Sequence, residues 1–131
     1  MSAAASILLD TTVLIDTLRN RNQRRSFLAG LVTAGHTLST STINVAEVYG
    51  GLRPGEEQVT SAFLASLQLM PVSASIAELA GKLQADFRRQ GQTRSIADML
   101  VAATAMEAGI SVATDNARDF QIAGLVLFPL P

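Results

Sequence analysis

The sequence predicts an α/β fold in which helices cover a parallel sheet. Two observations support this prediction. Short apolar runs alternate along the chain with longer segments whose apolar residues recur at helical spacing. The chain also has 131 residues, of which 48% are hydrophobic, which suits a single domain over residues 1–131 with a sizeable core.

The first half of the chain is expected to contain two strands and three helices. In order, these are a strand at 6–9, a short helix at 12–19, a helix at about 22–34, a strand at 36–40 and a helix from about 43 toward Gly50. The second of these helices has Phe27, Leu28, Leu31 and Val32 on one face, and Gly35 follows as a C-cap.

The second half repeats the alternation. The expected elements are a helix at about 56–69, a strand around 71–73, helices at about 75–90 and 95–108, and strands at 111–114 and 125–128. The helix at 75–90 has the clearest periodicity, since Ile76, Leu79, Leu83 and Phe87 follow helical spacing. Gly91 and Gly109 are expected to end the last two helices.

Composition excludes several classes of protein. The net charge of −1 gives no overall attraction to nucleic acid or membranes. No cysteine is present, which excludes a disulfide framework and a thiolate metal site. The start of the chain has no basic region before its apolar part, and the apolar window at 96–106 is interrupted by Asp98 and too short to span a bilayer. We therefore expect a soluble cytoplasmic protein with no membrane partner.

Four of the eleven acidic residues stand in apolar surroundings. These are Asp10, Glu47, Asp98 and Asp119. The other acids, among them Glu56, Glu57, Glu78, Asp86 and Glu107, have polar neighbours and suit solvated helix faces. A carboxylate in an apolar setting is costly unless it is paired or binds a metal.

Each of the four acids has two open interpretations. Ser95 and Asp98 have capping-box spacing, as have Asn44 and Glu47, whereas Asp10 and Asp119 suit a strand-end turn and a helix start. Alternatively, the acids form a site at the carboxyl edge of the sheet, where ligands bind in open parallel folds. Asp98 reaches that edge only if its helix lies obliquely.

Carboxylates gathered at one place need protons or a cation. At about 4 Å and an effective dielectric near 20, each pair repels by roughly 4 kcal/mol. Either some carboxylates take up protons or a divalent metal neutralises them. With no cysteine and a single histidine, His36, an oxygen-only ligand set favours Mg²⁺ or Mn²⁺, which commonly serve phosphoryl chemistry.

Three motifs resemble the PIN-domain ribonucleases, most of all the VapC toxins of bacterial type II toxin–antitoxin pairs. They are "LLDTTVLID", "STSTINVAEVYGGL" and "SIADMLVAATAMEAGISVATDNARDF", and the resemblance extends over residues 6–128. It implies a three-layer α/β/α fold with a central parallel sheet of four to five strands. It also implies Mg²⁺- or Mn²⁺-dependent cleavage of RNA, a cognate antitoxin and a homodimer.

The resemblance also assigns residues. The catalytic and metal-binding acids of the family fall on Asp10, Glu47, Asp98 and Asp119, and the polar residues beside them on Thr11, Ser41 and Thr114. The family's "T-x-N/D" step falls on Thr114-Asp115-Asn116, so Asp115 or Asn116 is expected to share the role of Asp119. Thr12 stands where the family more often has Asn or Ser.

Nine of the ten basic residues are arginines, which suit bidentate phosphate contacts. One cluster comprises Arg19, Arg21, Arg24 and Arg25, and a second, around Gly91, comprises Arg88, Arg89 and Arg94. They are either solvated helix ends or groups that hold RNA phosphates beside the acids; we expect the first cluster to bind RNA.

Three other classes of protein are alternatives to a nuclease. A haloacid-dehalogenase-like phosphatase needs a second Asp two residues after the first, where this chain has Thr12. A Rossmann nucleotide binder needs a glycine-rich first turn, which "DTTVLID" lacks. A catalytically inactive PIN-like module that binds RNA or protein remains the alternative.

Overall fold

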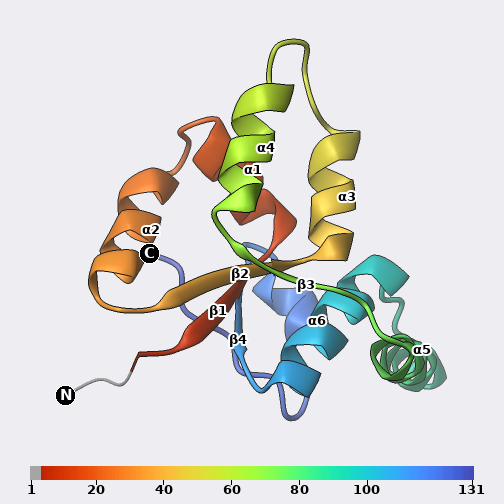
Figure 1. The fold of residues 1–131 in the computed structure, drawn as a ribbon. Coiled ribbons are helices and arrows are strands. Elements are labelled where there is room, and N and C mark those ends of the chain that lie inside the picture. Colours follow the sequence, from red (N-terminus) through yellow and green to blue (C-terminus); the bar gives the residue numbers. More distant parts are fainter. Residues whose placement is uncertain (1–3) are drawn as a thin grey trace.

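The protein has a central parallel sheet with helices on both of its faces. This computed structural model describes residues 4–131. The four strands β1 (Ser6–Leu9), β2 (Thr37–Ser41), β3 (Gln68–Met70) and β4 (Ser111–Ala113) are all parallel and follow the order β3-β2-β1-β4 (Figure 1). The predicted α/β/α architecture is confirmed, with four strands in the sheet.

Alternate side chains of β1 point to opposite faces of the sheet, and a different set of helices covers each face. Ile7 and Leu9 point into one core, and Leu8 points into the other. The first core packs against α1 (Thr11–Leu18), α2 (Arg24–Thr33), α3 (Thr42–Gly50) and α4 (Glu57–Ala65). The second packs mainly against α6 (Ile96–Ala108), which α5 (Ala74–Arg89) covers from outside (Figure 1).

The helix ends follow the predicted stop signals. Gly91 follows α5 with φ +77°, and Gly109 ends α6 with φ +68°, conformations that cost glycine little. None of the helices described within residues 4–131 is long and apolar enough to cross a membrane.

Two predicted strands differ from the structure. The strand placed around 71–73 is wrong, because α4 ends at Ala65 and leaves Gln68–Met70 to pair with β2 before Pro71, which has no N–H to donate. The strand expected at 125–128 is reduced to one parallel bridge between Val112 and Leu127, since β4 is only three residues long.

The parallel sheet brings several polar residues to its carboxyl edge. Asp10 directly follows β1, Ser41 ends β2, and Thr114 directly follows β4. β1 lies between β2 and β4, so Asp10 is flanked on both sides. This edge is where the candidate site forms.

Candidate active site

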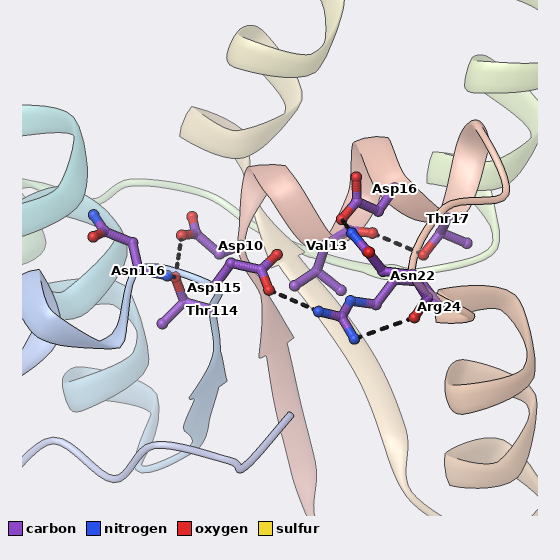
Figure 2. Close-up of polar contacts among 9 residues, drawn as sticks. All are labelled: Asp10, Val13, Asp16, Thr17, Asn22, Arg24, Thr114, Asp115 and Asn116. Carbon is purple, nitrogen blue, oxygen red and sulfur yellow. Dashed lines mark hydrogen bonds and ion pairs between the residues drawn. The ribbon is translucent and has the colours of Figure 1, made fainter. Parts of the chain in front are cut away.

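Asp10 is held by side chains from the segments that directly follow its two neighbouring strands, α3 after β2 and Thr114 after β4. It is only 7% exposed and occupies the N-cap position of α1, but its carboxylate forms no capping hydrogen bond. Instead, Oδ1 accepts from Asn44 Nδ2 at 3.1 Å and Oδ2 accepts from Thr114 Oγ1 at 2.7 Å (Figure 2 shows the Thr114 contact). A role as a strand-end turn residue therefore does not explain why the Asp10 carboxylate is buried and bonded to Asn44 and Thr114.

Asn44 organises this part of the site, although the sequence suggested it only as a cap. Its side chain is fully buried, and its Oδ1 accepts from Ser41 N at 3.3 Å and Ser41 Oγ at 2.6 Å. Its Nδ2 donates to Asp10 and, at 3.0 Å, to Thr11 Oγ1. These four bonds use the hydrogen-bonding capacity of the amide and fix its orientation. The three-residue spacing of Ser41 and Asn44 was the available signal.

Glu47 does not cap a helix. The α3 helix begins at Thr42 with Ser41 as its N-cap and Asn44 at the third position, so the predicted pairing of Asn44 with Glu47 is wrong. Glu47 lies farther along α3, where its Oε1 accepts from Thr11 Oγ1 at 2.7 Å. Thr11 thereby joins Glu47 to the Asn44 amide that also contacts Asp10.

Asp98 lies in the first turn of α6, as predicted. Ser95 Oγ accepts from the Asp98 backbone N–H at 3.0 Å, which is half of a capping box. Burial raises the pKa of the Asp98 carboxyl, and the negative charge of Asp10 raises that pKa further. A hydrogen bond from Ser95 opposes the rise, whereas Glu47 and Asp119 add to it. The negative charges of the other three acids therefore all act on Asp98.

Asp119 is fastened to the same edge through the loop after β4. It lies in a short 3₁₀-helix, Ala117–Phe120, and its Oδ2 accepts from Asn116 Nδ2 at 2.8 Å. The Asn116 backbone N–H in turn donates to Thr114 Oγ1 at 2.9 Å. Thr114 thus links the positions of Asp119 and Asp10.

Asp115 pairs with Arg24 instead of joining the other acids. Its Oδ1 lies 2.7 Å from Arg24 Nη2, and the Arg24 side chain is only 6% exposed (Figure 2). Asp115 is also absent from the charges that raise the pKa of Asp98. This ion pair occupies one carboxylate oxygen of Asp115 and the buried guanidinium of Arg24. Metal binding by Asp115 and RNA binding by Arg24 stay predictions, and both would require this ion pair to open.

Two other arginines of that cluster also have partners within the fold. Arg25 donates to the carbonyls of Thr17 and Leu18, at 2.8 and 2.9 Å, in the last turn of α1. Arg19 contacts Glu56 at 3.3 Å, and this hydrogen bond lowers the pKa of Glu56. Glu56 is thus paired, contrary to expectation. RNA binding by Arg19, Arg21 and Arg25 stays a prediction.

The four acids match a hard divalent cation by chemistry, but their side chains stand apart. Within residues 4–131, no three Asp, Glu or His side chains come close enough together to hold a metal ion. Carboxylate oxygens suit Mg²⁺ or Mn²⁺.

The fold and the site define an α/β protein in which the charges of Asp10, Glu47 and Asp119 act on Asp98 near the carboxyl edge of the parallel sheet. The family model described as "PIN domain" matches residues 7–125, and the chain belongs to this family. "Ribonuclease VapC10" of Mycobacterium tuberculosis is 34% identical over 114 residues, which cover 87% of this chain and 85% of the relative. "Ribonuclease VapC19" of the same species is 30% identical over 113 residues, covering 86% and 90%.

Solved structures agree with the family assignment. The crystal structure of VapBC2 from Rickettsia felis, bound to a DNA fragment from the promoter, contains a chain that superposes with a TM-score of 0.79. The two chains are 25% identical, and the match covers 94% of this chain and 97% of the other.

Proposed function

We propose that this chain is a metal-dependent endoribonuclease and the toxin of a toxin–antitoxin pair. One observation of the structure supports the chemistry: side-chain hydrogen bonds link Asp10 through Asn44 and Thr11 to Glu47 at the carboxyl edge of the sheet. The charges of Asp10, Glu47 and Asp119 also raise the pKa of Asp98. Relatives that cover most of the chain are named ribonucleases, which supports RNA as the substrate.

In this proposal Asp10, Glu47, Asp98 and Asp119 hold Mg²⁺ or Mn²⁺. When bound, such an ion lowers the pKa of water and stabilises charge on the phosphodiester under attack. Asp10 is the fixed member, because two side-chain hydrogen bonds hold its carboxylate in place. The more accessible acids turn toward the ion.

The neighbouring polar residues orient these carboxylates. Thr11 positions Glu47, and Thr114 positions Asp10. Ser41 acts through Asn44, and Asn116 holds Asp119. Hydrogen-bond partners of metal ligands of this kind typically change metal affinity 10- to 100-fold when they are removed.

The partner in this proposal is a cognate antitoxin protein, and the chain forms a homodimer. The support is that the Rickettsia neighbour is a VapBC complex. Co-purification of the chain with a candidate antitoxin expressed in the same cells tests the first point, and light scattering of the isolated chain tests the second.

The alternative is an inactive PIN-like module that binds RNA or protein. Incubation of the purified chain with total RNA in Mg²⁺, in Mn²⁺ and in EDTA separates the two. We expect cleavage in either metal, none in EDTA, and a loss of at least about 100-fold in Asp10→Asn. Asp86→Asn, on an exposed face of α5, is the matched control and should cleave like the parent. Metal-independent cleavage, or equal cleavage by Asp10→Asn, contradicts the proposal.

Asp10→Asn is suitable for this test because its hydrogen bonds can survive. The amide oxygen can still accept from Asn44. The new amide nitrogen can donate to Thr114 Oγ1, which has acceptor capacity besides the bond from Asn116 N. A loss of activity without a loss of the fold is therefore expected.

A further inference from the structure

An open pocket of about 610 Å³ lies directly beside the acids. Its lining comprises Gln92, Arg94, Asn116, Arg118 and Asp119. The first two precede α6, and the other three belong to the segment after β4. Since Asp119 also belongs to the acidic set, the pocket and the candidate active site share a wall.

Arg94 places a fixed positive charge in this pocket. Its guanidinium carbon lies 4.5 Å from the centre of the Phe87 ring, and its Nη1 and Nη2 donate to Thr93 O and Gln92 Oε1, at 3.1 and 3.0 Å. The Arg94 carbonyl accepts from Gln84 at 3.0 Å, which ties this loop to α5. Each terminal nitrogen still has an N–H beyond these bonds.

Asp119 only partly balances that charge. Arg94 Nε is buried without a hydrogen-bond partner and lies 3.9 Å from Asp119 Oδ1, which is too long for a hydrogen bond. Asn116 already occupies the other oxygen of Asp119.

Arg118 supplies a second, adjustable charge. It lies in the 3₁₀-helix and is exposed, and its side chain forms no salt bridge or hydrogen bond with any part of the chain that the structure describes. This distinguishes it from Arg19, Arg24 and Arg25, whose guanidinium groups all have partners in the fold. Arg118 can therefore turn toward a ligand without breaking a contact.

We propose that Arg94 and Arg118 bind the RNA phosphate next to the one that is cleaved. This rests on the proposed function and assigns the pocket a substrate group. Two guanidinium groups suit the planar, bidentate recognition of a phosphate, and the amides of Gln92 and Asn116 offer further donors. The position of the pocket also fits. An RNA chain whose scissile phosphate lies at the acids would continue past Asp119 into this pocket.

The test is the salt dependence of RNA binding. A short fluorescein-labelled single-stranded RNA of mixed sequence is titrated with protein by fluorescence anisotropy, in Ca²⁺ to slow cleavage. We expect Arg118→Gln to weaken binding several-fold and to reduce the slope of log K against log salt by about 0.7, the value for one phosphate on a single strand. Arg53→Gln is the matched control, since Arg53 is exposed in the loop between α3 and α4 and forms no salt bridge with a described residue; it should bind like the parent.

Arg94→Lys adds a second measurement. It retains the charge but loses the planar fork that spans Gln92, Thr93 and the Phe87 ring. We expect weaker binding with a nearly unchanged salt slope. A circular dichroism melt shows whether Arg94→Lys folds. If Arg94→Lys does not fold, Arg118→Gln still tests the proposal.

The outcomes separate this inference from the proposed function. If the parent cleaves RNA in Mg²⁺ while Arg118→Gln binds with the parent's affinity and slope, the phosphate site is refuted and the nuclease stands. If Arg118→Gln lowers the slope but the parent never cleaves RNA, the pocket still binds an RNA phosphate, whereas the nuclease and the placement of that phosphate next to a cleaved one are refuted. If Arg53→Gln loses as much RNA affinity and salt slope as Arg118→Gln, the RNA is attracted by the overall positive charge of the arginines, and the phosphate site is also refuted.

Discussion

The ion pair between Arg24 and Asp115 joins two segments 91 residues apart in the sequence. Removal of the Asp115 charge by Asp115→Asn leaves the buried guanidinium of Arg24 without its counter-charge. Within residues 4–131, the one other hydrogen bond of this guanidinium is long, 3.5 Å from Nη1 to the carbonyl of Asn22 (Figure 2). We expect a clear loss of stability.

The magnitude follows from the exposure of the two partners. Breaking a fully buried pair costs about 3–5 kcal/mol, whereas exposed pairs contribute about 0–1 kcal/mol. Here the side chains are 6% and 35% exposed, so solvent screens the carboxylate in part and we expect a loss of about 2 kcal/mol. For a chain of this length, that corresponds to a fall in Tm of roughly 6–10 °C.

Thermal unfolding followed by circular dichroism measures this fall. The control is Asp86→Asn, which removes a salt bridge to Arg89 whose partners are 71% and 55% exposed, and its Tm should move by less than about 2 °C. Combining Arg24→Met with Asp115→Asn should recover much of the loss, because no buried charge remains. An unchanged Tm in Asp115→Asn would refute the reasoning, as would a double variant that is less stable than the sum of its parts.

Three further expectations concern the acids and their hydrogen-bond partners. In EDTA, Asp98→Asn should be more stable than the parent at neutral pH. The raised pKa of Asp98 gives stability that is full below its ordinary value of 3.8 and is lost as the pH rises through the raised value; the variant's advantage should therefore vanish in acid melts. Asn44→Asp should lose more than about 3 kcal/mol in a urea titration, because it buries a second carboxylate against Asp10. Thr11→Val should bind Mn²⁺ about 10-fold more weakly by calorimetry, since Glu47 loses its donor, and Thr11→Ser should restore the affinity.

The spacing of apolar residues predicted most of the helices, because an amphipathic helix shows this spacing within its own local sequence. The helix at 75–90 was recognisable from Ile76, Leu79, Leu83 and Phe87, and the structure places α5 at Ala74–Arg89. The strand near Pro71 was misplaced because the polar Gln68 conceals a short edge strand, whose position depends on pairing with β2. Such pairing is a tertiary effect that the local sequence does not record.

The site was harder to predict because its contacts join distant segments. The sequence placed Asp10 at the end of a strand, but the approach of Asp98 depends on how α6 packs beneath the sheet. The burial of Arg24 depends on Asp115, and nothing in "NRNQRR" distinguishes Arg24 from the exposed Arg21. Asn44 resembled an ordinary helix-start residue until its amide was seen to contact Asp10.

Mn²⁺ binding by isothermal titration calorimetry tests the central claim that four acids hold one catalytic metal site. The parent is compared with single variants that neutralise each acid, Asp10→Asn, Glu47→Gln, Asp98→Asn and Asp119→Asn, and with the controls Asp115→Asn and Asp86→Asn. We expect each of the four variants to lose at least about 10-fold in affinity, because each removes a charged oxygen ligand, while both controls bind like the parent. The claim would be contradicted if the parent bound no Mn²⁺, or if Asp115→Asn lost affinity while Asp98→Asn kept it.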